Sequence, residues 1–244
     1  MFFRALRAER MKLRRSQVWL AFFILPILPA FLGTFNYLQN TEILTEAWYS
    51  LWTQFTLFLC YFFLPALIGV YSSYLLRLEH TRHNWYGVLT SPVPSIMVYL
   101  AKLSMVSIMV VLTQIWMGIL FIISGLLAGL QPPLPAELFL WMVLGVVGGI
   151  VIGSVQLCIS LVIHSFAVPV GIAFVGGIVA LPVLSKGYGV WYPYSLLSLG
   201  MSANGPTEAM QFSLIQFLLN GMIFVLICII FAGIWFAKRD VATG

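Results

Sequence analysis

RLEHTRHNWYGVLTSPVP, residues 77–94, is the stretch that decides how the rest of this sequence is interpreted. It separates two long apolar runs and is rich in charge, within a chain that is 61% hydrophobic and only 8% charged. Side chains of this kind are costly inside hydrocarbon, and an excess of Lys and Arg is typical of cytoplasmic loops. The sequence therefore predicts that residues 77–94 connect two membrane spans on the cytoplasmic side.

The composition indicates a membrane protein along its whole length. A mean hydropathy of +1.03 leaves too little polar surface to cover a water-soluble globule of 244 residues. Runs of about 20 apolar residues are long enough to cross a bilayer as helices. Six such runs are present, at about residues 18–37, 51–76, 95–130, 138–163, 166–184 and 212–237. We therefore predict an all-α, polytopic chain that forms one membrane domain over residues 1–244.

Lys and Arg divide unequally between the two sides of this arrangement. Only Lys186 falls on the predicted outer side. The other eleven fall on the inner side: Arg4, Arg7, Arg10, Lys12, Arg14, Arg15, Arg77, Arg82, Lys102, Lys238 and Arg239. The bias predicts that both termini are cytoplasmic. The basic residues act here as topology signals, so the net charge of +5 does not indicate nucleic-acid binding.

The N-terminal residues 2–16 have a helical amphipathic pattern, with apolar side chains on one side and arginines on the other. We expect an interfacial helix on the inner membrane surface, with an unstructured basic flank as the alternative. Its basic side chains would suit anionic headgroups, and Lys102 is placed to snorkel towards the same surface. The apolar run that follows is too long for a cleaved signal, so it is predicted to be a retained span, kinked by Pro26 and Pro29.

Two further segments carry predictions about packing. Residues 185–211 mix aromatic and apolar side chains, and we expect them to dip back into the outer interface as one or two short helices. Gly145, Gly149 and Gly153 repeat every four residues, a spacing that lets another helix approach closely. They predict either a dedicated helix interface or ordinary packing within the chain.

The sequence contains none of the common catalytic signatures. It has no G-x-x-x-x-G-K-[ST] phosphate loop, no H-E-x-x-H pair and no G-x-S-x-G elbow, so we predict that it is not an enzyme. Glu79, His80 and His83 share one helix face, but a solvated polar face is favoured over a metal site. Six polar side chains fall inside the membrane region: Gln54, Gln114, Gln156, His164, Gln216 and Asn220. For the glutamines, interhelical hydrogen bonds are favoured over a substrate path.

Residues 77–94 have the mixture of charged and aromatic side chains that anchors a protein interface. We predict that a soluble partner docks here, with Glu79 and Arg82 as docking charges. The residues predicted to couple the chain to this partner are Arg77, Glu79, His80, Arg82, His83, Trp85, Tyr86 and Leu89.

Three segments give the chain a resemblance to a known family. They are LRAERMKLRRS at the start, RLEHTRHNWYGVLTSPVPSIMVYLAK ending at Lys102, and the aromatic outer segment before the last span. In order and spacing the chain resembles the type-2 ABC exporter permeases, and within them the permease subunits of bacterial lantibiotic immunity transporters. These motifs are loose, and none is a catalytic signature.

The resemblance implies how the parts would work together. Glu9 and Lys12 would belong to the interfacial helix, residues 79–89 would form a coupling helix on an ABC ATPase subunit, and residues 188–201 would be re-entrant. ATP and Mg²⁺ would bind that ATPase, with no cofactor on this chain. A second permease, identical or homologous, would complete the assembly in the bacterial plasma membrane. The alternatives are a non-transporting membrane anchor or sensor, or an ABC permease for another drug or lipid.

The predicted outer side carries the acids Glu42, Glu46, Glu137 and Glu208, with Trp48, Trp52, Trp191 and Tyr192 near the interface. One explanation is topology alone: outer loops are poor in Lys and Arg, so acids predominate there without any role in function. The functional alternative is that they attract a cationic antimicrobial peptide. On that hypothesis the outer gate includes Glu42, Glu46, Trp191, Tyr192 and Glu208.

Overall fold

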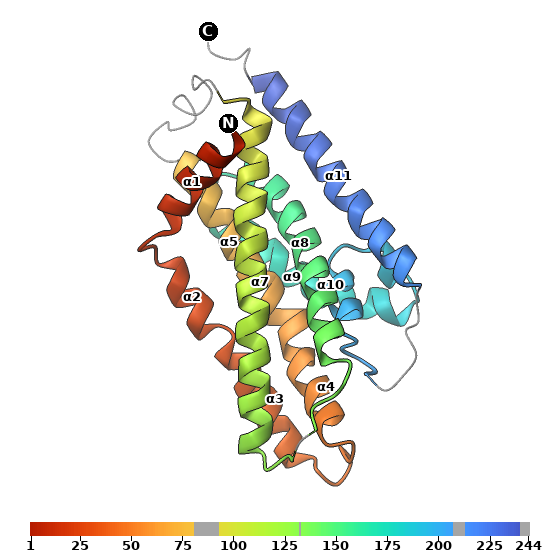
Figure 1. Cartoon of the computed structure of the whole chain (residues 1–244). Coiled ribbons are helices and arrows are strands. Elements are labelled where there is room, and N and C mark those ends of the chain that lie inside the picture. Colours follow the sequence, from red (N-terminus) through yellow and green to blue (C-terminus); the bar gives the residue numbers. More distant parts are fainter. Residues whose placement is uncertain (81–92, 132, 207–212, 240–244) are drawn as a thin grey trace.

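The computed structural model describes residues 1–80, 93–131, 133–206 and 213–239, and every regular element in these ranges is a helix (Figure 1). Six helical segments in these ranges are long and apolar enough to cross a membrane. They are Val18–Gln39, Trp48–His80, Ser95–Leu127, Leu138–Val162, Ala167–Ser185 and Leu214–Lys238. The prediction of an all-α, multi-pass membrane protein is confirmed.

The first helix, α1 (Phe2–Leu13), lies across one end of the bundle (Figure 1). It ends because Arg14 is extended and Arg15 adopts a left-handed conformation, with φ of 64°. The indole nitrogen of Trp19 donates a hydrogen bond to the carbonyl of Leu13 over 3.0 Å, which satisfies one of the carbonyls left unpaired at a helix end. The predicted helix in residues 2–16 is present, while its place on a membrane surface stays a prediction.

The first span is broken once. Helix α2 (Val18–Ile24) is followed by α3 (Ile27–Gln39), and the break falls at Leu25 and Pro26. Proline has no backbone N–H and its ring clashes with the preceding turn, so the helix cannot continue through Pro26. Pro29 makes no second break, because it lies in the first turn of α3, where N–H groups have no helical partner. The kink predicted at Pro26 is confirmed.

The second span changes its helical geometry near its middle. It consists of α4 (Trp48–Phe58), a π-helical turn η1 (Leu59–Phe63) and α5 (Leu64–His80). The π turn ends just before Pro65, whose missing N–H disrupts the regular ladder. Gly177 of α9 (Ala167–Ser185) packs on this turn, and a Cβ atom there would lie 2.5 Å from the carbonyl oxygen of Tyr61. A larger residue would hold α9 away from the turn.

The glycine repeat lies in α8 (Leu138–Val162) and faces α7 (Ser95–Leu127). A Cβ atom at Gly149 would lie 2.6 Å from Val110, and one at Gly153 would lie 2.7 Å from Val106. Gly145 faces Gln114, also on α7. Of the two alternatives left by the sequence, these glycines therefore serve packing within the chain.

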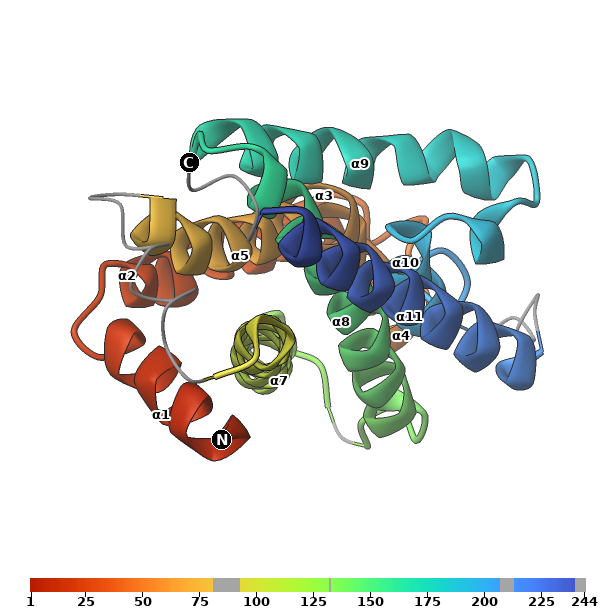
Figure 2. The same ribbon diagram turned by 90° about the horizontal axis from the view of Figure 1, so that it is seen from above.

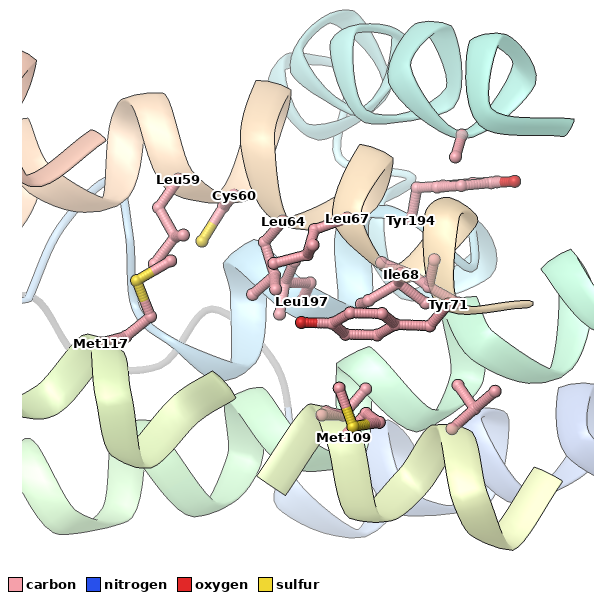
Figure 3. Packing of buried hydrophobic residues seen from close by; sticks show 14 of the residues in the cluster. Leu59, Cys60, Leu64, Leu67, Ile68, Tyr71, Met109, Met117, Tyr194 and Leu197 are labelled. Atoms are coloured by element: carbon pink, nitrogen blue, oxygen red, sulfur yellow. The ribbon is translucent and has the colours of Figure 1, made fainter. Parts of the chain in front are cut away.

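The segment before the last span forms two short helices, η3 (Gly189–Trp191) and α10 (Ser195–Gly200). Helix α10 packs closely on α8, since a Cβ atom at Gly148 would lie 2.6 Å from the backbone of Leu197. Figure 3 shows Leu197 projecting into the core beside Leu64 and Leu67 of α5, and Tyr71 opposite Met109 of α7. The expectation of one or two short helices is met, and their re-entry into the outer interface stays a prediction.

The last helix, α11 (Leu214–Arg239), packs against α8 and ends at the same end of the molecule as α1 (Figure 1). Seen from above, α5 lies between α7 and α9, while α1 lies on the side of α7 away from α9 (Figure 2). The first and last helices share one end of the bundle, as an even number of spans requires. Which side of the membrane this end faces stays a prediction.

Candidate functional site at the end of helix α5

The last turn of α5 carries Arg77, Glu79 and His80, immediately before residues 81–92, which lie outside the described residues. Consecutive residues of an α-helix point about 100° apart, so Glu79 and His80 face different neighbours. Each of the three side chains contacts a different part of the bundle. This turn therefore connects several helices of the bundle to residues 81–92, which contain most of the predicted coupling residues.

Glu79 is buried, with 2% of its surface exposed, and its carboxylate is paired with two lysines. The Lys102 ammonium of α7 donates to Oε1 of Glu79 over 2.8 Å, and Lys12 of α1 donates to the same oxygen. Lys102 also donates to the backbone carbonyl of Leu75 over 2.9 Å. One turn of α5 is thus held by ion pairs to two other helices.

Glu9 of α1 completes the arrangement. Its two carboxylate oxygens accept from Lys12 over 2.6 Å and from Lys102 over 2.9 Å. We call Glu9, Lys12, Glu79 and Lys102 the four-charge cluster. It is electrically neutral and joins α1, α5 and α7 through alternating acids and bases.

Because the cluster is buried, breaking one of its ion pairs costs more free energy than breaking an ion pair on the surface. The side chains of Glu9, Glu79 and Lys102 are at most 3% exposed, and that of Lys12 is 30% exposed. Burial lowers the pKa of Lys12, but the charge of Glu9 and the hydrogen bond to Glu79 outweigh it, so the pKa lies above its ordinary value. Removing one member would leave a buried charge without its partner, which typically costs about 3–5 kcal/mol.

The other two side chains of this turn face away from the cluster. One ring nitrogen of His80, Nε2, lies 2.9 Å from the carbonyl oxygen of Ser160 on α8. The His80 ring also packs on that of His164, with centroids 4.3 Å apart. The guanidinium of Arg77 lies 5.6 Å from the ring centroid of Phe166, just before α9. None of these three contacts pairs two opposite charges.

The structure changes two predictions about this site. The expectation that Glu79 is an exposed docking charge does not fit, because its carboxylate lies inside the four-charge cluster. Lys102 does not snorkel towards a membrane surface, because it is 1% exposed and paired with Glu9 and Glu79. The carboxylates opposite Lys102 come from distant parts of the sequence, so spacing alone did not reveal the pairing.

The remaining coupling residues, Arg82, His83, Trp85, Tyr86 and Leu89, lie outside the described residues and stay predictions. Glu79 and His80 do not point towards a common metal site. Glu79 faces lysines, whereas His80 faces the carbonyl oxygen of Ser160. Among the described residues no group of three or more His, Cys, Asp or Glu side chains has an arrangement that could hold a metal ion.

The predicted outer-gate residues divide by exposure. Glu42, Glu46 and Trp191 are exposed, whereas Tyr192 is half-buried and donates to the carbonyl of Gly176 over 3.0 Å. Glu208 lies outside the described residues. These positions stay candidates for an outer gate.

Two tryptophans named with them at the sequence level are buried instead. The indole of Trp52 donates to the carbonyl of Met201 over 2.8 Å, and the indole of Trp48 donates to that of Gln131 over 2.8 Å. Both side chains therefore hold the fold together. Neither is free to meet a peptide at the surface.

Polar side chains in the spans hold the segment around α10 in place. The Gln156 amide donates to the Tyr194 hydroxyl over 2.6 Å, and the Asn220 amide donates to the carbonyl of Val190 over 2.9 Å. The Tyr61 hydroxyl donates to Asn204 over 2.8 Å, a role that the sequence analysis missed. For Gln156 the favoured prediction of a hydrogen bond to another part of the bundle is confirmed.

A comparison with protein-family models matches residues 5–180 to the family described as "ABC-2 family transporter protein". A search of curated proteins gave no match. The matched residues cover well over half of the chain and include all four members of the four-charge cluster and the last turn of α5. The chain therefore belongs to the ABC-2 family of transporter proteins.

Proposed function

We propose that this chain is the permease subunit of a bacterial ATP-driven exporter that expels cationic antimicrobial peptides, in the manner of lantibiotic self-protection. Membership of the ABC-2 family makes the chain a transmembrane component that works with a separate ABC ATPase. The observation that carries the mechanism is the position of the last turn of α5. It is attached to four other parts of the bundle and leads directly into residues 81–92.

The strengths of these attachments determine which helices would move together. Separating a buried charge from its partners typically costs about 3–5 kcal/mol, whereas a neutral hydrogen bond contributes about 0.5–1.5 kcal/mol. A pull on α5 would therefore carry α1 and α7 along through the four-charge cluster. The hydrogen bond of His80 to Ser160 would give way before the four-charge cluster, so the last turn of α5 could shift relative to α8.

Irregularities in two spans would let this motion occur without unfolding a helix. The break at Pro26 separates α2 from α3, and the π turn η1 separates α4 from α5. Such interruptions are common sites of bending. Motion of the α1 end would then be passed only in part to α3 and α4 at the opposite end.

A cationic substrate is supported by the charges at that opposite end. Glu42, Glu46 and Glu137 are exposed near the ends of α3, α4 and α8, and Glu137 accepts a hydrogen bond from Tyr49 over 3.0 Å. The exposed indole of Trp191 offers an apolar contact on the segment before α10. ATP and Mg²⁺ would bind the ATPase, and a second permease, identical or homologous, would supply the other half of the path.

The test uses the chain co-produced with its ATPase and placed in vesicles, with ATP hydrolysis measured as a cationic lantibiotic is added. In the wild type, the peptide should stimulate hydrolysis. Trp85→Ala should abolish the stimulation without lowering the amount of inserted permease, because an aromatic interface anchor is lost. Phe139→Ala is the matched control, since it removes an aromatic ring that is 79% exposed at the start of α8.

The two parts of the proposal fail in different ways. Normal stimulation in Trp85→Ala would contradict the coupling role of residues 81–92. If the wild type retains its ATPase but does not respond to any cationic peptide, the coupling role survives and the peptide substrate is wrong.

A further inference from the structure

The side of α1 that faces away from the bundle carries most of its arginines. At 100° per residue, Arg4 and Arg7 lie on the side of α1 opposite Glu9 and Leu13, and Arg10 lies beside Arg7 on the flank of the helix. Arg14 follows directly after the helix, and all four arginines are exposed. Phe3 and Met11 lie among them, 81% and 63% exposed, so the expected separation of apolar side chains from arginines on this helix is incomplete. We call these six residues the outward face of α1. It combines positive charge with large apolar side chains that the rest of the described chain leaves uncovered.

No acid offsets the charge of this face within α1. Glu9 is the one acidic residue of the helix, and it is 3% exposed and paired with Lys12 and Lys102. The exposed charges of α1 are therefore all positive. A phosphate group approaching the outward face would meet guanidinium groups, which bind phosphate through two parallel hydrogen bonds.

The short connection to α2 limits how far α1 can lie from the first membrane span. Only residues 14–17 separate α1 from α2, so the end of α1 lies within about 18 Å of the first spanning residue, Val18. The hydrogen bond from Trp19 to the carbonyl of Leu13 holds the two helices together. We therefore expect α1 to lie at the depth of the lipid headgroups, where Trp is commonly found.

We propose that the outward face of α1 binds the phosphates of anionic phospholipids, and that this binding strengthens the hold of α1 on the bundle. Phe3 and Met11 favour lipid over an acidic protein surface, because they can enter the apolar part of the leaflet beside the arginines. Glu9 on the opposite side of the helix connects the bound lipid to α5 and α7 through the four-charge cluster. The proposal concerns the chain alone and does not depend on the proposed function.

The experiment measures the thermal unfolding of the purified full chain in detergent micelles that contain phosphatidylglycerol or phosphatidylcholine. Phosphatidylglycerol should raise the Tm by about 4 °C more than phosphatidylcholine, because a ligand that binds only the folded chain stabilises it. At about 1 M salt the Debye length falls to about 3 Å, so most of this difference should disappear. An equal effect of both lipids would overturn the proposal.

Variants then locate the binding. Replacing Arg4, Arg7, Arg10 and Arg14 together by Gln should abolish the extra stabilisation, or raise the phosphatidylglycerol needed for half of it by about tenfold or more. The four corresponding Lys replacements should keep it, because they keep the charge. If the Gln set does not insert, Arg7→Gln and Arg14→Gln serve singly, each weakening the lipid effect about fivefold.

Lys238→Gln is the matched control, since it removes one exposed positive charge from α11 at the same end of the bundle. It should keep the full difference between the two lipids. A comparable loss in this control would mean that general charge attraction is responsible, and would overturn the assignment to α1. If the Gln set keeps the lipid effect but no longer binds the ATPase, the outward face serves that protein instead.

Discussion

Two short helices, α1 and α10, are both held against the long spans, but by different kinds of contact. The four-charge cluster holds α1, whereas α10 and its flanking residues are held by neutral hydrogen bonds and by glycine contacts with α8. Buried ion pairs are costly to break singly, because each break leaves an unpaired charge. Neutral contacts can be exchanged one at a time. We therefore expect the α1 end to move as a unit and the α10 region to rearrange in steps.

The largest expected effect comes from breaking the cluster. Lys102→Met should lower the free energy of unfolding by about 3–5 kcal/mol, because Glu9 and Glu79 would then share Lys12 alone. Thermal unfolding of the purified chain in detergent measures this loss. Adding Glu79→Gln to Lys102→Met should recover part of the stability, since Glu9 and Lys12 remain as a neutral pair.

Lys186→Met is the control for that variant, because Lys186 is an exposed lysine. It should change the Tm by less than about 1 °C. An equally small change for Lys102→Met would mean that the four-charge cluster contributes little to stability. Helix α1 would then be held no more firmly than α10.

The second prediction concerns the contact of α10 with α8. Gly148→Ala should destabilise the chain by about 1–3 kcal/mol, because the added Cβ atom would lie 2.6 Å from the backbone of Leu197. Gly171→Ala is the matched control on α9, where a Cβ atom would meet nothing within 4 Å. It should be neutral or stabilising by about 0.5–1 kcal/mol. If both variants unfold alike, α10 does not depend on close contact with α8.

The sequence predicted the elements of this fold better than their contacts. Runs of apolar residues located all six spans, and Pro26 located the break in the first, because both features act through the local backbone. The partners of Lys102 could not be predicted in this way. Glu9 and Glu79 come from other helices, so only the packing of α1, α5 and α7 brings them to it.

Contacts between distant residues were equally hard to predict at the opposite end of the bundle. Trp52 has the aromatic character expected at a membrane interface, yet its indole is buried against Met201, which lies far away in the sequence. The helical period of the glycine repeat identified the close-packed face of α8 but did not reveal which helix covers it. Only the fold shows that Gly149 and Gly153 face α7, while the adjacent Gly148 faces α10.

The third prediction tests how much one neutral hydrogen bond stabilises the α10 region, for comparison with the ion pairs of the four-charge cluster. Tyr194→Phe should destabilise the chain by about 1–2 kcal/mol, because the buried amide of Gln156 would lose its partner. Gln156→Leu should cost a similar amount, and the double variant less than the sum of the two. A double-mutant cycle of unfolding free energies measures the coupling, and strict additivity would show that the 2.6 Å hydrogen bond contributes nothing.

The smallest effect is expected from charges that are exposed. Replacing Glu42, Glu46 and Glu137 together by Gln should leave the folding of the chain unchanged, since exposed charges each contribute about 0–1 kcal/mol. The amide oxygen introduced by Glu137→Gln would still accept the hydrogen bond from Tyr49. Protection of cells against a cationic lantibiotic should fall by about two- to fivefold at low salt, because the attraction of the peptide to this end of the permease is weakened.

Salt distinguishes this attraction from a contact inside the path. Charges exposed to water are screened over about 8 Å at physiological ionic strength, so the difference between wild type and variant should shrink as salt rises. Buried charges such as those of the four-charge cluster are screened much less, and variants of Lys102 should keep their defect at every salt concentration. Full protection by the triple variant at low salt, with normal protein levels, would make the three acids a by-product of topology. The substrate contacts would then have to lie among the spans, where the buried amide oxygens of Gln114 and Gln156 have no hydrogen-bond partner among the described residues.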